Sequence, residues 1–229
     1  MKITLYVDVV SPFTYIAYHV LRQDPVFKNC QITYIPIFLG GIFKMAGNIA
    51  PLRIKNKDKW INNERLRWAK YFNVPIVNTV PDGFPANTVQ VMRTICAVSH
   101  LANTDQPAPS PSSPPAQQAI IKALDAVFDA YWVKKRDITD KDVIADVFSR
   151  AGWEDLAKVS ELTAGDAKRM LAENTDGAFA DGAFGLPWFV CENDRSEKEG
   201  FWGVDHLGVM LDFLGLEKPA AGGEWRAML

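Results

Sequence analysis

The sequence has few of the residues that hold metals or form disulfides, with three cysteines and three histidines among 229 residues. Cys30, Cys96 and Cys191 lie far apart without Cys-x-x-Cys spacing, so we expect neither a disulfide framework nor a redox-active dithiol. The histidines are dispersed and do not pair with the cysteines at ligand spacing. This composition predicts no metal site, and buried or inert thiols in a reducing compartment.

The chain also lacks an excess of charge and a long apolar run. Its formal net charge is −2 and its basic residues are scattered, which argues against a nucleic-acid-binding surface. No apolar stretch approaches the roughly 18 residues of a membrane span, and a strand-like run follows Met1 directly, so we expect no membrane span and no signal peptide. The glycine patterns of nucleotide-binding loops are missing. We therefore expect a small molecule as the partner.

Strand patterns occur only near the two ends of the chain. Residues 2–9 alternate between apolar and polar side chains, a helix is expected over residues 12–22, and residues 31–38 form a β-rich run. This order predicts a β-α-β unit with parallel strands. The C-terminal pattern is β-β-α, with strands expected at 187–191 and 199–202 and a helix at 204–214.

The middle of the chain shows helical periodicity. Five helices are expected. The first carries Trp60, Leu66, Ala69 and Phe72, the second spans residues 88–101, and the third carries Ile120 through Trp132. The fourth carries Val143 through Phe148, with Thr139 and Asp142 at capping-box spacing, and the fifth spans residues 166–173. Residues 103–118 contain five prolines among Ser, Ala and Gln, a composition that predicts a mobile surface loop.

The two strand-bearing ends are the halves of a thioredoxin fold, separated by the helical section. We predict an α/β, thioredoxin-like fold with an inserted all-helical domain. Residues 1–56 and 174–229 form the thioredoxin-like domain in this prediction, and residues 57–173 form the insertion. The insertion accounts for the length of the chain.

Ser11 follows the first strand at the point where a helix should open. A serine N-cap followed by proline is a common helix start, so a purely structural role is one reading. A helix N-terminus also carries a partial positive charge of about 0.5 and favours a bound anion, a thiolate included. In thioredoxin-like proteins this turn carries Cys-x-x-Cys, whereas here Ser11 and Thr14 occupy the two positions. Since no mixed disulfide can form at a serine, a disulfide oxidoreductase is disfavoured, and the sulfur must arrive with the ligand.

Five segments carry a family resemblance in their order along the chain. They are 8–15 (DVVSPFTY), 38–48 (FLGGIFKMAGN), 73–76 (NVPI), 177–187 (GAFADGAFGLP) and 201–206 (FWGVDH). The chain resembles the kappa-class glutathione transferases and the bacterial 2-hydroxychromene-2-carboxylate isomerases, which share a DsbA-like thioredoxin fold with an inserted helical domain. The resemblance implies glutathione as co-substrate, a small electrophilic second substrate and a homodimer.

By this resemblance Ser11 is the catalytic residue, whose hydroxyl donates a hydrogen bond to the sulfur of glutathione. A free thiol titrates near 8.5, and lowering its pKa by about two units needs about 2.7 kcal/mol. One charge-assisted hydrogen bond (roughly 1.5–3 kcal/mol) together with a helix terminus (roughly 0.3–1 kcal/mol) can supply this. Thr14 receives no role.

The resemblance also assigns residues that bind glutathione. Leu186 and Pro187 match a cis-proline loop in which the residue before proline pairs with the cysteinyl unit through its backbone. Asn48 matches a glutathione-contacting asparagine, although an Asn after Gly also forms turns. A trans proline opening a strand is the alternative for Pro187.

Further binding residues are expected at the last helix and in a lysine-rich segment. Asp205 matches an acidic residue that binds the γ-glutamyl end of glutathione, and equally suits a helix start. Val204 stands where the kappa enzymes carry a hydroxyl, and His206 replaces an arginine. Lys57 aligns with a lysine that reaches the glycine carboxylate, although a solvated role fits as well.

The leading functional interpretation is glutathione transfer to small electrophiles or hydroperoxides, as in detoxification. The alternatives are a glutathione-dependent 2-hydroxychromene-2-carboxylate isomerase and a non-catalytic glutathione-binding module. Phe43 and Trp60 are our candidates for the wall of the second-substrate pocket. We expect a cytoplasmic protein by default, because residues 227–229 (Ala-Met-Leu) lack the basic residue of a peroxisomal tripeptide. The resemblance leaves mitochondria and peroxisomes open, since kappa-like relatives occur in both.

Overall fold

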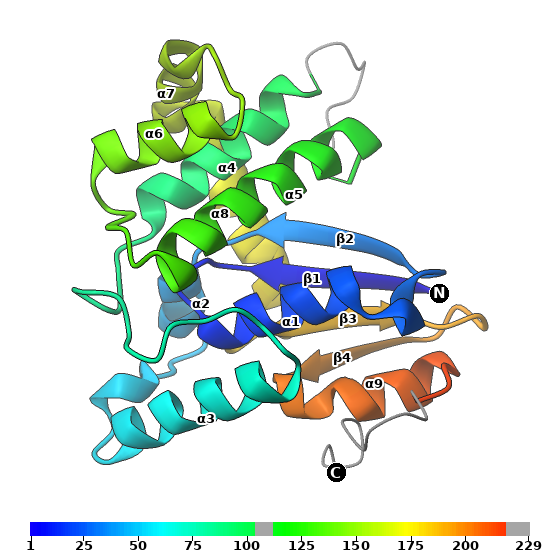
Figure 1. The fold of residues 1–229 in the computed structure, drawn as a ribbon. Coiled ribbons are helices and arrows are strands. Elements are labelled where there is room, and N and C mark those ends of the chain that lie inside the picture. The colour runs from blue at the N-terminus through cyan, green and yellow to red at the C-terminus, as the bar shows by residue number, and fades with distance from the viewer. Residues whose placement is uncertain (104–111, 219–229) are drawn as a thin grey trace.

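A computed structural model describes residues 1–103 and 112–218, and its centre is one four-stranded sheet (Figure 1). The strands β1 (Lys2–Val7), β2 (Gln31–Pro36), β3 (Trp188–Glu192) and β4 (Lys198–Trp202) follow the order β2-β1-β3-β4. β1 pairs in parallel with β2 and antiparallel with β3, which pairs antiparallel with β4. The two ends of the chain therefore complete one sheet, and the predicted thioredoxin-like fold is confirmed.

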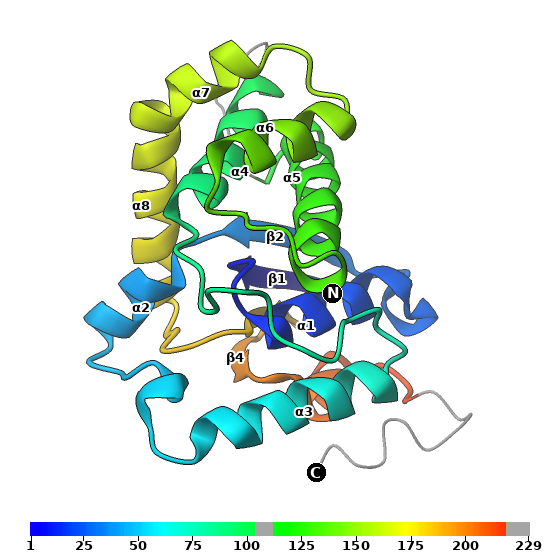
Figure 2. The same ribbon diagram turned by 60° about the vertical axis from the view of Figure 1, so that its left-hand side comes forward.

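The helices surround this sheet as an outer layer (Figures 1 and 2). They are α1 (Pro12–Gln23), α2 (Leu39–Met45), α3 (Lys57–Tyr71), α4 (Val89–Leu101), α5 (Pro114–Phe128), α6 (Lys141–Arg150), α7 (Leu156–Ala164), α8 (Asp166–Ala180) and α9 (Leu207–Leu214). Helices α4 to α7 gather at one side of the sheet and α3 lies at the other, while α8 runs from α4 and α7 back to α2. Among the described residues, no helix is long and apolar enough to cross a membrane.

The helical section and the sheet share one large core. Helix α5 continues into a π-helical turn (Asp129–Val133), whose Trp132 is fully buried. The Trp132 indole Nε1 donates to the carbonyl oxygen of Val9 at 2.9 Å. Side chains from β1, α1, α4 and α5 belong to the same buried cluster. The domain boundaries at 57 and 173 remain a prediction, since this core runs across both.

The buried face of α3 differs from the expected one. Trp60 is 55% exposed, and the buried residues are Ile61, Arg65 and Ala69. The Arg65 guanidinium donates to the carbonyl oxygens of Val77 and Asn78 at 2.8 and 2.6 Å. These hydrogen bonds allow a charged side chain to be buried on a helix face where the sequence pattern predicts apolar residues. Of the predicted stripe, Ala69 is buried and Phe72 packs against the core, whereas the prediction that Trp60 belongs to the buried face was wrong.

Several helix ends also differ from the sequence prediction. Asp140, not Thr139, caps α6, because its Oδ1 accepts from the backbone nitrogen of Asp142 at 2.8 Å. Helix α8 continues past residue 173 to Ala180, through Gly177. Helices α2 and α7 had not been predicted.

The expected proline-rich loop at 103–118 is shorter than predicted at its C-terminal end. Helix α5 begins at Pro114, and the Ser113 hydroxyl accepts from the backbone nitrogen of Ala116 at 3.3 Å. Proline suits the first turn of a helix, where its missing N–H has no partner to lose. Residues 104–111, and the C-terminal tripeptide at 227–229, lie outside the described residues.

Candidate active site

Ser11 is the N-cap of α1, as the sequence predicts. Its Oγ accepts from the backbone nitrogen of Thr14 at 3.2 Å, Pro12 occupies the first helical turn, and the Ser11 residue is 6% exposed. Its own hydroxyl proton has no acceptor within the described part of the chain. The Ser11 hydroxyl is therefore free to donate to a ligand at the helix N-terminus.

Asp8 holds this turn in place through hydrogen bonds to its buried carboxylate, a role that the sequence analysis missed. Its carboxylate accepts from the backbone nitrogens of Val10 (3.1 Å) and Leu39 (2.8 Å) and from the Thr88 hydroxyl (3.0 Å), so it joins the turn to the starts of α2 and α4. Complete burial raises the pKa of Asp8 to about 6, against the lowering effect of these hydrogen bonds. A carboxylate ending an apolar strand was the signal available in the sequence.

The peptide bond between Leu186 and Pro187 is cis, as predicted. The backbone N–H and C=O of Leu186 make no hydrogen bond within the described residues, although Leu186 is 8% exposed. The Pro187 carbonyl oxygen accepts from the backbone nitrogen of Gly203 at 3.1 Å. The turn thus leaves the backbone groups of Leu186 without partners among the described residues. A second cis peptide, Phe84–Pro85, had not been predicted.

A cavity of about 270 Å³ brings four predicted site residues together. Ser11, Asn48, Lys57 and Leu186 all line it. Its remaining wall is largely apolar and includes Phe43, Ile61, Phe84, Pro85, Phe184 and Trp202. Phe43 thus lies where we predicted, whereas Trp60 is not among the lining residues.

Asn48 connects the two loops on either side of this cavity. Its Nδ2 donates to the Phe184 carbonyl oxygen at 2.9 Å, and its Oδ1 accepts from the backbone nitrogen of Ile49 at 2.8 Å. The side chain therefore holds the loop before Pro187 against the loop after α2. Its contact with glutathione remains a prediction.

Three other predicted residues lie behind or beside the cavity. Pro187 and Val204 are buried, and Asp205 is exposed beside His206, with 3.5 Å between Asp205 Oδ2 and His206 Nδ1. Val204 is 2% exposed and packs into the large core, and its carbonyl oxygen accepts from the backbone nitrogen of Leu207. None of the three lines the cavity.

Thr14 and the cysteines offer no further reactive group at the cavity wall. Thr14 is fully buried, and its Oγ1 has no hydrogen-bond partner within the described residues. Burial raises the pKa of the Cys96 thiol to about 12, and no cysteine lines the cavity. No group of three or more His, Cys, Asp and Glu among the described residues is placed to hold a metal ion.

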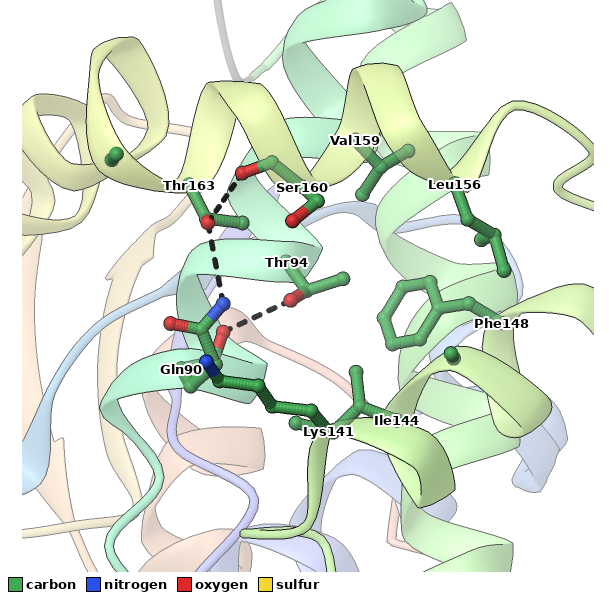
Figure 3. A pocket seen from close by; sticks show the side chains of 11 residues that line it. Gln90, Thr94, Lys141, Ile144, Phe148, Leu156, Val159, Ser160 and Thr163 are labelled. Carbon is green, nitrogen blue, oxygen red and sulfur yellow. Dashed lines mark hydrogen bonds between the residues drawn. The ribbon is translucent and has the colours of Figure 1, made fainter.

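A second cavity, of about 350 Å³, lies between α4, α6 and α7 (Figure 3). The Thr94 hydroxyl donates to the Gln90 carbonyl oxygen, and the Thr163 hydroxyl donates to that of Ser160 while accepting from Gln90 Nε2. These hydroxyl protons are therefore already used within the helices. None of the predicted site residues lies here, so we place the candidate active site at the smaller cavity.

Comparison with known families agrees with this fold. Residues 2–215 match the family model of the DSBA-like thioredoxin domain. The chain belongs to this family. Glutathione S-transferase kappa 1 of Caenorhabditis elegans is 24% identical, covering 95% of this chain and 92% of the relative. The 2-hydroxychromene-2-carboxylate isomerase of Pseudomonas putida is 25% identical, covering 94% and 95%.

A solved structure shares the fold of this DSBA-like thioredoxin domain protein. It is a 2-hydroxychromene-2-carboxylate isomerase with a TM-score of 0.73 and 24% identity, covering 94% of this chain and 95% of the other. Kappa glutathione transferases and these isomerases are therefore homologues of this chain, as the motifs predicted. Ser11 caps α1 and Thr14 lies in its first turn, and neither position holds a cysteine.

Proposed function

We propose that this protein is a glutathione transferase of kappa type, in which Ser11 activates the thiol of bound glutathione. The observation that supports the proposal is that two residues with unused hydrogen-bonding groups, Ser11 and Leu186, line the same cavity. The Ser11 hydroxyl has an unused proton at a helix N-terminus, and the buried Leu186 has an unused backbone N–H and C=O. A cysteinyl unit paired with Leu186 like an added strand brings its sulfur to Ser11.

The proposed reaction depends on the Ser11 hydroxyl and on the partial positive charge at the N-terminus of α1. The Ser11 O–H donates to the sulfur, the thiol proton leaves to solvent, and the thiolate is held by this hydrogen bond and the N-terminus of α1. The thiolate then attacks an electrophilic carbon, forming the C–S bond while the leaving group departs with its electron pair. With a hydroperoxide the thiolate takes the outer oxygen and releases the alcohol, and a second glutathione then yields the disulfide and water.

The remaining residues bind and orient the two substrates. Lys57 on the cavity wall suits the glycine carboxylate of glutathione, and Asp205 suits the ammonium of its γ-glutamyl end. Asn48 keeps the two walls at a fixed separation through Phe184. The apolar wall with Phe43 and Trp202 suits an electrophile of small, apolar type.

A glutathione-dependent 2-hydroxychromene-2-carboxylate isomerase is the second candidate. It is favoured by the 25% identity to the Pseudomonas putida isomerase over 94% of this chain. In that reaction the same thiolate adds to the substrate and is later expelled. A non-catalytic glutathione-binding module, the third candidate, keeps the site without turnover. A homodimer and a cytoplasmic, mitochondrial or peroxisomal location stay with the proposal as expectations from the resemblance.

Turnover separates these candidates. Conjugation of chlorodinitrobenzene by the wild-type protein, lost in Ser11→Ala with an unchanged circular dichroism spectrum, supports the transferase and excludes the binding module. Rapid conversion of hydroxychromene carboxylate without conjugation overturns the transferase in favour of the isomerase. Glutathione binding by calorimetry without either activity leaves the binding module.

A further inference from the structure

Exposed apolar and cationic side chains line the candidate active-site cavity and continue in the segment next to it. All eight residues from 53 to 60 are exposed. The apolar members of this surface are Ile49, Ile54, Trp60, Phe184 and Trp202, each at least 40% exposed. Its cationic members are Lys44, Arg53, Lys55, Lys57 and Lys59. We call these ten residues the basic rim.

The basic rim concentrates positive charge in a chain that is acidic overall. Between residues 44 and 60, five cations stand against the single carboxylate of Asp58, which gives this segment a net charge of +4 in a chain of net charge −2. None of the five cations forms an ion pair within the described part of the chain, although many basic residues elsewhere do. Lys57 is the rim cation that the proposed function assigns to glutathione, and the other four cations have no ligand in that proposal.

The basic rim is continuous with the cavity mouth. Ile49, Ile54, Lys57, Phe184 and Trp202 line the cavity and are exposed as well. The segment between α2 and α3, which carries Ile49, Arg53, Ile54 and Lys55 of the rim, projects at the periphery of the molecule (Figure 2). Exposed apolar side chains that lie together mark an interaction surface, and four of the five apolar rim residues line the cavity.

The charge of the basic rim argues against a second copy of this chain as its partner. In a two-fold dimer the same patch meets itself, so five cations would face the same five cations. Like charges brought together across an interface are unfavourable. A dimer of this protein is therefore expected to use another face.

We propose that the basic rim docks on an anionic lipid surface, with the cavity mouth toward the headgroups. Exposed Trp60 and Trp202 suit the interface of a bilayer, where an amphipathic ring has both an apolar and a polar neighbour. Ile49 and Ile54 reach the acyl boundary, and the cations attract acidic headgroups. Apolar substrates then enter the cavity directly from the lipid.

Vesicle sedimentation tests this docking and needs no turnover, so its failure is distinct from failure of the proposed function. The wild-type protein is expected to sediment with vesicles of phosphatidylcholine and phosphatidylglycerol in equal parts, but not with phosphatidylcholine alone. Each rim cation contributes roughly fivefold to partitioning, so Arg53→Gln, Lys55→Gln and Lys59→Gln together should lower it on the order of a hundredfold. Added salt should weaken binding by the wild type.

The matched control removes three exposed cations from the helical section: Lys141→Gln, Lys158→Gln and Lys168→Gln. This variant should partition as the wild type does. Trp60→Ala should weaken binding while keeping its salt dependence. Equal sedimentation with both vesicle types, or an equal loss in the control, overturns the proposal. So does a dimer that Trp60→Ala converts to a monomer in light scattering, because a second copy would then cover the rim.

Discussion

The indole of Trp132 donates to the carbonyl oxygen of Val9 across 123 residues of sequence, at 2.9 Å. Val9 stands two residues before Ser11, so the helical section directly holds the turn that carries the candidate catalytic hydroxyl. The Arg65 guanidinium lies over the Trp132 ring, 6.0 Å from its centroid, which links α3 to the same point. The insertion is therefore part of what shapes the site.

Trp132→Phe should lower the free energy of unfolding by about 2 kcal/mol beyond the loss of packing, because it leaves the buried Val9 carbonyl without its donor. Denaturant unfolding measures this. The matched control is Trp188→Phe, since the Trp188 indole nitrogen is buried without a hydrogen-bond partner. An equal loss in both variants would show that the hydrogen bond to Val9 contributes little.

Ser11→Ala should reduce conjugation at neutral pH by roughly 10- to 100-fold, because the thiolate loses one charge-assisted hydrogen bond. The apparent pKa of bound glutathione, followed through the pH dependence of the rate, should rise. The substitution also removes the cap of α1, at a cost of about 1 kcal/mol of stability. Ser11→Thr keeps both the cap and the donor and should retain the low apparent pKa. A lowered affinity for glutathione with unchanged turnover would assign Ser11 to binding alone.

Asp8→Asn should flatten the pH dependence of stability. The folded pKa of Asp8 is about 6, above its ordinary value of 3.8, so folding favours the protonated form. The contribution of Asp8 to stability is therefore largest below about pH 4 and is lost as pH rises through about 6, by about 3 kcal/mol. Asparagine is neutral throughout, so the free energy of unfolding of the variant minus that of the wild type should rise from pH 4 to pH 7. Thermal unfolding from pH 4 to pH 7 measures it, and a constant difference contradicts the assignment.

Asn48→Asp should weaken glutathione binding by roughly tenfold, because aspartate keeps the acceptor for Ile49 but loses the donor to Phe184. Calorimetry gives the affinity, and amide hydrogen exchange at residues 184–186 reports the freed loop. Asn87→Asp is the matched control, since Asn87 Oδ1 accepts from the backbone nitrogen of Val89 in the same local manner. If exchange stays unchanged while affinity falls, Asn48 acts by touching glutathione.

Asp205→Ala should raise KM for glutathione roughly tenfold and leave kcat unchanged, because a γ-glutamyl contact is equal in the ground and transition states. His206→Ala, which changes the neighbouring side chain, should have a smaller effect. A fall in kcat for Asp205→Ala would instead assign this carboxylate to the chemical step.

The sequence alone predicted the sheet and three local features beside the candidate site. Alternation in residues 2–9, a serine before proline and a proline before the third strand are local signals, and the structure places all of them as expected. Helix α2 was hidden because it carries Gly40 and Gly41, which lower helix propensity. A Cβ at Gly40 would lie 2.6 Å from Cζ of Phe38, so this glycine serves close packing.

Features that depend on distant contacts could not be predicted. Arg65 is buried because the loop at residues 77 and 78 presents two carbonyls to it. Asp8 is buried because Leu39 and Thr88 come to it from elsewhere in the chain. Trp60 is exposed because α3 turns its Ile61, Arg65 and Ala69 inward instead. The burial or exposure of these side chains depends on contacts with distant parts of the chain, which the periodicity of the sequence does not indicate.

The central position of β1 has a consequence for synthesis of the chain on the ribosome. Its pairing with β2 forms within the first 36 residues, whereas its other edge waits for β3, where Leu5 pairs with Phe189. Until that late segment emerges, the nascent chain carries an open strand edge of the kind that invites aggregation. The last quarter of the chain therefore both completes the cavity and closes the sheet edge that is exposed during translation.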